Sequence, residues 1–291
     1  MRVIILGAQG NLGTEIKKIL LAKPEINLLA LDKQDLDVLD EPALRSKLDE
    51  FLPELIINTV AYNAVDECES EAGFALAKKL NGEVPANLGR FALEHQAILL
   101  HYSSDYVFSG DRKGGYSEDD VPDPINNYGR SKLMGETAIK DMGASGLKYY
   151  LIRTSKLFGP KGESPVAKAS FFDTMISLAK KQEEIKVVDG ELSCFTYTPD
   201  LAQAAWSLVE DKAPFGLYHL VNSEPVTWYG AAQELFSLLG KKLKLTAIAS
   251  EDLPRPAKRP QASVLLSTKV EAMRSYREAL REYLRETKST A

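Results

Sequence analysis

The first thirteen residues constrain the fold most strongly. Residues 3–6 form a short apolar run, and the glycine-rich segment 7–13 follows it directly. Downstream, Ile16, Ile19 and Leu20 have the spacing of one apolar helix face. A buried strand that enters a helix through a glycine turn is typical of the first unit of an open, parallel α/β sheet.

The same alternation continues along the first half of the chain. Apolar runs that suit buried strands recur at residues 26–31, 55–59, 97–102 and 148–153, with helical patterns between them. This rhythm predicts an α/β fold with a doubly wound parallel Rossmann-type sheet and a smaller mixed α/β substrate domain.

The predicted domain boundary follows the point where this rhythm loosens. We expect a dinucleotide-binding domain over residues 1–154, with strands that return to it near residues 185–188 and 217–221. Residues 155–291 are expected to form mainly the substrate-binding domain.

Composition excludes several classes of protein. The 291 residues carry 36 basic and 41 acidic side chains, a formal charge of −5, which gives no general attraction for nucleic acid or anionic membrane. Two cysteines cannot build a disulfide framework or a zinc cage, and no metal site is predicted. No apolar stretch reaches the roughly 18 residues of a membrane span. These features predict a cytoplasmic protein that binds neither membrane nor nucleic acid.

The glycine-rich segment reads Gly-x-x-Gly-x-x-Gly, and Asp32 follows its last glycine by 19 residues, at the end of the second apolar run. Glycines at a strand-to-helix turn allow the backbone to approach a pyrophosphate, and a carboxylate after the second strand accepts hydrogen bonds from an adenosine ribose. The alternative is a tight turn with no ligand. Lys33 suits a 2′-phosphate, so NAD and NADP both stay open.

A second set of residues carries acid–base chemistry. Tyr128 and Lys132 are four residues apart on one predicted helix, which begins about 24 residues after Ser104. An ammonium group near the phenol is expected to lower the phenol's pKa from about 10, so that it can exchange a proton with a substrate oxygen. Ser104 lies at a strand end, where parallel sheets gather ligand-binding groups.

Together these features resemble the extended short-chain dehydrogenase/reductase family, and within it the dTDP-4-dehydrorhamnose reductases. The resemblance runs from the first strand to about residue 268. It rests on the ordered segments at residues 61–66, 101–108, 127–136, 153–155, 216–220 and 259–260.

The resemblance implies a role for each matching residue. The predicted catalytic residues are Ser104, Tyr128 and Lys132. The predicted cofactor-binding residues are Gly7, Gly10, Asn11, Leu12, Gly13, Asp32, Asp37, Val38, Ala61, Tyr62, Asn63, Tyr102, Tyr128 and Lys132. The predicted substrate-binding residues are Ser104, Asp105, Tyr106, Lys156 and Arg259.

The reaction that the resemblance implies is an NAD(P)H-dependent reduction, with NADPH favoured. It would reduce the C4 ketone of a dTDP-4-keto-6-deoxy sugar, giving dTDP-L-rhamnose or a close relative for polysaccharide synthesis. Tyr106 stands where related dehydratases carry a glutamate, which argues against elimination of water. A nucleotide-sugar epimerase and a non-catalytic regulatory subunit of the methionine adenosyltransferase type stay as alternatives. A homodimer is considered as the assembly.

Two segments depart from the family's pattern. The family commonly has tryptophan where this chain has Lys156, so a cation replaces a flat apolar wall against the sugar. The alternative is that Lys156 points into solvent and has no such role. The family's Gly-x-Pro-Thr turn is Ser-Cys-Phe-Thr at residues 193–196. A basic cluster at Arg255, Lys258 and Arg259 in the proline-rich loop suits a nucleotide diphosphate, with a solvated loop as the alternative.

Overall fold

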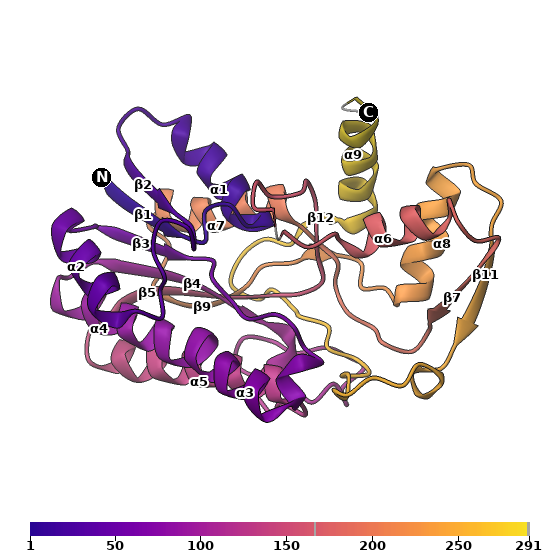
Figure 1. The fold of residues 1–291 in the computed structure, drawn as a ribbon, viewed down its shortest axis with the longest axis horizontal. Coiled ribbons are helices and arrows are strands. Elements are labelled where there is room, and N and C mark those ends of the chain that lie inside the picture. The colour runs from indigo at the N-terminus through magenta and orange to yellow at the C-terminus, as the bar shows by residue number, and fades with distance from the viewer. Residues whose placement is uncertain (166, 290–291) are drawn as a thin grey trace.

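A six-stranded parallel sheet forms the centre of the molecule. The computed structural model describes residues 1–165 and 167–289 (Figure 1). Every neighbouring pair of strands in this sheet is parallel. In spatial order the strands are β2 (Asn27–Leu31), β1 (Arg2–Leu6), β3 (Leu55–Asn58), β4 (Ile98–Ser104), β5 (Lys148–Thr154) and β9 (Gly216–His219). The predicted doubly wound Rossmann-type fold is therefore confirmed.

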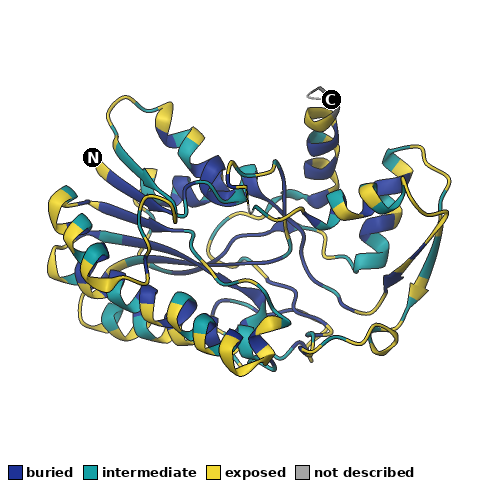
Figure 2. Ribbon diagram, in the orientation of Figure 1, coloured by how far each residue is buried: buried dark blue, intermediate teal, exposed yellow. Residues whose placement is uncertain are grey.

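The continuous apolar strands follow from burial on both faces of the sheet. In β1, Val3 and Ile5 enter one core cluster, whereas Ile4 and Leu6 enter the other. Successive side chains of a strand point to opposite faces, so a strand covered on both sides needs an uninterrupted apolar run. Figure 2 shows these strands as the buried centre and the outer surfaces of the helices as exposed.

Helices cover both faces of the sheet (Figure 1). One face carries α1 (Asn11–Leu21) and α7 (Thr198–Glu210), which pack against each other. The other face carries α2 (Glu41–Phe51), α4 (Val84–Glu94) and α5 (Asn127–Ala144). α3 (Glu71–Ala77) runs into α4 through a π-helical segment, Lys78–Glu83.

The second half of the chain builds a smaller unit beside the sheet. Its aromatic-rich core joins α6 (Phe171–Leu178), α8 (Trp228–Leu238) and α9 (Tyr276–Ser289). Its short parallel pairs are β7 (Glu184–Val188) with β11 (Lys244–Ile248), β6 (Leu157–Phe158) with β8 (Thr196–Tyr197), and β10 (Asn222–Ser223) with β12 (Met273–Ser275).

The expectation that the strand near residues 185–188 returns to the main sheet is wrong. β7 pairs with β11 in a separate two-stranded sheet, whereas β9 does join the main sheet beside β5. The burial of β7 alternates at its start, with Glu184 and Lys186 exposed and Ile185 buried. This pattern suits a small sheet that α8 covers on one face rather than a central strand buried on both faces.

The positions of the strands place the site. The chain steps from β1 outwards to β2 and then crosses back to β3, so the order of the strands reverses between β1 and β3. Ligands of open α/β sheets bind at the carboxyl ends of the strands at such a point. Within the described residues, no helix has the length and hydropathy needed to cross a membrane.

Candidate active site

The glycine turn between β1 and α1 has the geometry of a phosphate cradle. Gly7 has φ +82°, and a Cβ atom there would lie 2.7 Å from Thr59 Oγ1. A Cβ atom at Gly13 would lie 2.1 Å from the Gly7 carbonyl oxygen. The turn therefore requires glycine at both positions. Gly10 is the N-cap of α1 and has no side chain to occupy the helix N-terminus, which leaves room for an anion there.

Asp32 lies against this turn, as the sequence predicts. Its Oδ2 accepts a 2.8 Å hydrogen bond from the Gln9 backbone N–H, and its Oδ1 accepts one of 2.7 Å from Lys33 N. The carboxylate is therefore fixed at the end of β2, while Lys33 beside it is exposed. The position of the carboxylate fits an adenosine ribose, and the next residue in the chain is an exposed lysine.

A segment from the second half of the chain crosses the glycine turn. The Asn11 side chain accepts a 2.9 Å hydrogen bond from Gly162 N and donates one of 3.0 Å to the Lys168 carbonyl. Ser164 N donates to the Gln9 carbonyl at 2.9 Å. A Cβ atom at Gly162 would lie 2.5 Å from that carbonyl, so only glycine allows this approach. Sequence analysis did not anticipate this contact.

The loop after β3 is held by a residue that sequence analysis missed. Asn81, in the π-helical segment, is fully buried; its side chain accepts from Tyr62 N at 2.8 Å and donates to the Tyr62 carbonyl at 2.9 Å. It also donates to Ser131 Oγ at 2.9 Å. Asn81 therefore ties the predicted cofactor loop to α5. The extra residue of a π-turn aims a side chain away from the regular helical direction, and no local pattern in the sequence reveals it.

The start of α5 positions Tyr128 and Lys132. Asn126 is the N-cap, and its side chain accepts a 2.8 Å hydrogen bond from Gly129 N. One turn further, the buried Lys132 ammonium donates a 2.6 Å hydrogen bond to the Tyr102 carbonyl on β4. Burial lowers the pKa of Lys132 to about 8. The Tyr102 ring itself packs in the core of the sheet.

The phenol of Tyr128 differs from the expectation. Burial raises its pKa above the ordinary value, an interaction with Ser104 opposes the rise, and the Asp105 charge adds to it. The predicted lowering by Lys132 is not found, because the Lys132 ammonium is bound to the Tyr102 carbonyl. The Tyr128 phenol is therefore neutral and keeps its proton. Tyr106 packs edge-on against it, with 5.7 Å between ring centroids.

Ser104 and Asp105 belong to a buried hydroxyl cluster at the carboxyl end of β4. Ser104 Oγ donates to Asp105 Oδ1 at 3.0 Å. Asp105 Oδ2 accepts from Ser193 Oγ at 2.9 Å and from Ser263 Oγ at 2.6 Å. Asp105 is only 2 % exposed, and burial raises the pKa of its carboxyl while the serines and Lys156 lower it.

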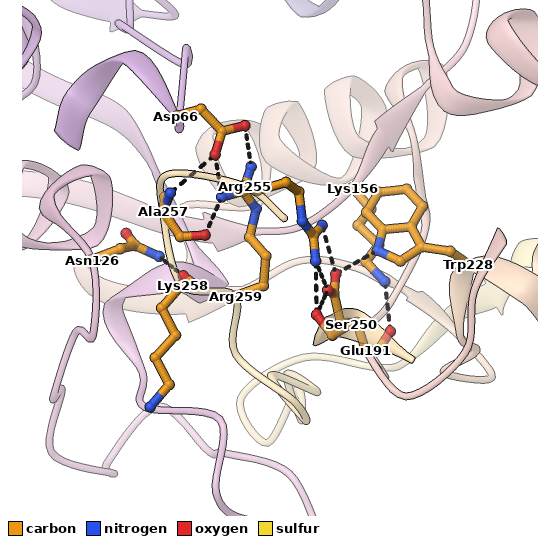
Figure 3. Close-up of polar contacts among 10 residues, drawn as sticks. All are labelled: Asp66, Asn126, Lys156, Glu191, Trp228, Ser250, Arg255, Ala257, Lys258 and Arg259. Carbon is orange, nitrogen blue, oxygen red and sulfur yellow. Dashed lines mark hydrogen bonds and ion pairs between the residues drawn. The ribbon is translucent and has the colours of Figure 1, made fainter. Parts of the chain in front are cut away.

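Lys156 is not the solvated lysine of the alternative interpretation. Its ammonium donates a 3.0 Å hydrogen bond to the Glu191 carbonyl and lies 4.0 Å from the Trp228 ring centroid (Figure 3). It also lies 5.1 Å from the centroid of the Phe195 ring. Burial lowers its pKa to about 8, although the charges of Asp105 and Glu191 oppose the change.

The basic cluster is largely engaged by carboxylates. Arg259 makes two hydrogen bonds to Asp66, of 2.8 and 2.7 Å, and Arg255 pairs with the buried Glu191. Lys258 is exposed, and its side chain extends away from both arginines (Figure 3). The loop that carries these residues lines a hollow of about 680 Å³ together with Ile125, three residues before Tyr128.

The remaining predicted residues lie around the same edge of the sheet. Ala61 and Asn63 are exposed on the loop after β3, and Asp37 is exposed beyond β2, where it accepts a 3.0 Å hydrogen bond from Leu39 N. Val38 is buried in the core cluster beneath α2. Their contacts with a cofactor stay predictions.

Comparison with known proteins decides the family. The model of the RmlD substrate binding domain matches residues 1–289. The chain belongs to the RmlD family.

Members of the family with related activities are similar along the whole chain. A dTDP-4-dehydrorhamnose reductase of Aggregatibacter actinomycetemcomitans is 33% identical, over 93% of this chain and 92% of its own length. A probable dTDP-4,6-dihydroxy-2-methyloxan-3-one 4-ketoreductase of Streptomyces antibioticus is 36% identical, over 97% and 94%. The chain is thus a dTDP-4-dehydrorhamnose reductase-like, NAD(P)-dependent oxidoreductase.

A solved structure agrees with this result. The dTDP-4-dehydrorhamnose reductase from Bacillus anthracis, in complex with NADP, is 33% identical with a TM-score of 0.90 and covers 98% of this chain and 99% of its own. The family uses NAD(P)H.

Proposed function

We propose that the protein reduces the C4 ketone of a dTDP-4-keto-6-deoxy sugar, yielding dTDP-L-rhamnose or a close relative. The observation that carries the proposal is the neutral Tyr128 phenol beside Ser104, because reduction of a ketone needs a proton donor. The exact sugar is the open part, since Lys156 and residues 193–196 differ from the family's usual pattern.

The predicted site residues at this edge of the sheet have separate roles in the proposed reaction. Tyr128 delivers a proton to the oxygen that develops negative charge, and Ser104 holds the phenol in place. Lys132, one helical turn behind, is expected to contact the cofactor, the role that the resemblance implies. The reduced nicotinamide supplies the hydride when bound. The glycine turn, Asp32 and the loop fixed by Asn81 form the cradle on which the dinucleotide is expected to lie.

We propose NADPH as the preferred reductant. The Asp32 carboxylate accepts hydrogen bonds from two backbone N–H groups, and the residue that follows it, Lys33, is exposed. A cation at this place suits a 2′-phosphate. The nucleotide diphosphate of the substrate is assigned to the hollow beside Ile125, where Arg259 is already oriented by Asp66 and Lys258 is exposed.

The test is consumption of NADPH by the purified protein with a panel of nucleotide-linked 4-keto sugars, with the product checked by mass spectrometry. Stoichiometric oxidation with gain of two hydrogens by the sugar supports a reductase. Epimerised product with no net oxidation would indicate the epimerase alternative, and no turnover of any sugar would favour a binding subunit.

The variant Tyr128→Phe tests the proton donor. Phenylalanine keeps the aromatic packing against Tyr106, so NADPH binding should persist. It has no hydroxyl proton to give, so kcat should fall by about 10²- to 10⁴-fold. Turnover equal to that of the wild type would remove Tyr128 from this role.

A further inference from the structure

The side chain of Asn126 makes two hydrogen bonds at once. Its Oδ1 accepts a 2.8 Å hydrogen bond from Gly129 N and so caps α5. Its Nδ2 donates a 2.9 Å hydrogen bond to the Lys258 carbonyl, in the loop at residues 250–261 (Figure 3). The orientation of the amide is fixed, because the backbone N–H needs its oxygen and the carbonyl needs its NH₂ group. Asn126 is only 2 % exposed, so loss of either partner leaves a buried polar group unpaired.

The loop has a second anchor on the same side. Arg259 makes its two hydrogen bonds to Asp66, and Ala257 N donates to that carboxylate at 3.1 Å. Asp66 leads directly into the segment that holds Glu69, and Glu69 Oε1 accepts a 2.8 Å hydrogen bond from Asn127 N. The loop, this segment and the start of α5 are thus linked in a closed triangle of hydrogen bonds.

The other end of the loop is fixed to the smaller unit. Ser250 Oγ donates to Glu191 Oε1 at 2.6 Å, and Arg255 pairs with the same carboxylate. Trp228, at the start of α8, donates from Nε1 to Glu191 Oε2 at 2.9 Å (Figure 3). The loop therefore reaches from the smaller unit to the head of α5, and between its anchors it lines the hollow of about 680 Å³.

The first turn of α5 has little room to move. A Cβ atom at Gly129 would lie 2.0 Å from the Tyr106 carbonyl oxygen, and the Tyr106 ring packs edge-on against Tyr128. Just before the helix, Asp123 N donates to the Val107 carbonyl at 2.9 Å. A turn packed this closely moves with its cap, so the bond from the cap to the loop sets where Tyr128 lies relative to a group bound in the hollow.

We propose that Asn126 is a positioning residue: its bond to the Lys258 carbonyl holds the loop ready for a nucleotide diphosphate and sets that ligand in register with Tyr128. The inference rests on the proposed function, which assigns the diphosphate to this hollow. A loop that is already held in place loses less freedom when the ligand binds. Loss of the bond should therefore appear as weaker binding.

The variants Asn126→Asp and Asn126→Ser separate the two bonds. Asparagine, aspartate and serine are equally good N-caps, so α5 keeps its cap in both variants. Aspartate has no proton to donate to the Lys258 carbonyl, and the serine hydroxyl is one atom too short to reach it. Two different replacements keep the test valid if one of them folds poorly.

The first measurement is the affinity for dTDP by titration calorimetry. The Kd should rise by about 2- to 13-fold in both variants, the factor that one neutral hydrogen bond is worth. The Kd for NADPH should not change in Asn126→Ser. Affinity for dTDP equal to that of the wild type, or an equal loss of NADPH affinity, would overturn the proposal.

Asp40→Ser is the matched control. Asp40 is the N-cap of α2, where it accepts a 3.0 Å hydrogen bond from Ala43 N, and α2 lies far from the loop at residues 250–261 (Figure 1). The exchange of this cap should leave the Kd for dTDP unchanged. A rise equal to that in Asn126→Ser would show that any exchanged cap weakens binding and would contradict the proposal.

The register with Tyr128 has its own kinetic readout. With the keto sugar, kcat of Asn126→Ser should fall by about tenfold or more in addition to the rise in KM, because a displacement on the order of 1 Å at the reacting groups is costly. A raised KM with kcat unchanged would show that the bond serves the loop alone and would refute the positioning of Tyr128.

Amide hydrogen exchange separates this inference from the proposed function, because it needs no turnover. In the wild type, dTDP should slow exchange both in the loop at residues 250–261 and in the first turn of α5, residues 127–131. In Asn126→Ser, it should slow exchange in the loop alone. The inference stands on this pattern even if no keto sugar is reduced. No effect on residues 127–131 of the wild type, or the same effect in the variant, would overturn it even if a keto sugar is reduced.

Discussion

Arg153 on β5 and Glu136 on α5 form an ion pair in which neither side chain is exposed. Two hydrogen bonds join them, of 2.9 and 2.6 Å, and the Arg153 guanidinium also lies over the Phe108 ring. The pair fixes α5, and with it Tyr128 and Lys132, to the sheet.

Breaking this pair should destabilise the protein strongly. Arg153→Met leaves an unpaired buried carboxylate, and we expect the free energy of unfolding to fall by about 3–5 kcal/mol in urea titrations. The double variant Arg153→Met/Glu136→Leu removes both charges and should recover much of the loss. A single variant as stable as the wild type would contradict this account.

The buried Lys132 amine predicts a pH dependence of stability. Its pKa is about 8 in the folded chain against the ordinary value of 10.5, so between these pH values the unfolded chain binds more protons. Stability attributable to this group therefore rises with pH across the interval and is lost as pH falls through 8. As pH rises from 8 to 10.5, the unfolding free energy of the wild type should rise by on the order of 3 kcal/mol relative to that of Lys132→Met. A difference independent of pH would show that the amine is not buried.

Lys33 should determine the preference between the two dinucleotides. An exposed ammonium group directly after Asp32 suits a charged hydrogen bond to a 2′-phosphate, which is worth about 1.5–3 kcal/mol. Lys33→Ala should raise KM for NADPH by roughly 10- to 150-fold and leave KM for NADH nearly unchanged. Lys47→Ala, which removes a half-buried lysine of α2 that pairs with Glu50, is the control. Equal changes for both cofactors would exclude Lys33 as the selector.

The Asp66–Arg259 pair should affect substrate affinity, because it ties the loop at residues 250–261 to the first half of the chain. Arg259→Lys loses the two-pronged geometry, and KM for the nucleotide sugar should rise by about tenfold with a smaller change in kcat.

Arg274→Lys is a control for that variant. It breaks a similar pair, of 2.8 and 2.7 Å, between β12 and Asp200 on α7. It should lower thermal stability without changing KM. If both variants changed KM equally, the effect would come from general loosening of the chain.

The sequence predicted the parts of the site that depend on local pattern. Glycines at Gly7 and Gly13 are required by a turn within one βα unit, and Asp32 reaches that turn because parallel strands end at the same edge of the sheet. The position of Tyr128 and Lys132 at the head of one helix follows from their spacing. The direction of the Lys132 side chain does not follow from the spacing. Its ammonium group can donate to several acceptors, and the one that it reaches, the Tyr102 carbonyl, belongs to another element, β4.

The amino-acid sequence alone thus determined the doubly wound fold, the glycine turn and the family, since these depend on periodicity and on residues close together in the chain. Only the tertiary structure decided the partners of Asp105, which lie 88 and 158 residues away at Ser193 and Ser263, and the place of Lys156 above Trp228. Burial at these contacts sets which groups are charged, and burial is a property of the packed chain rather than of any segment of it.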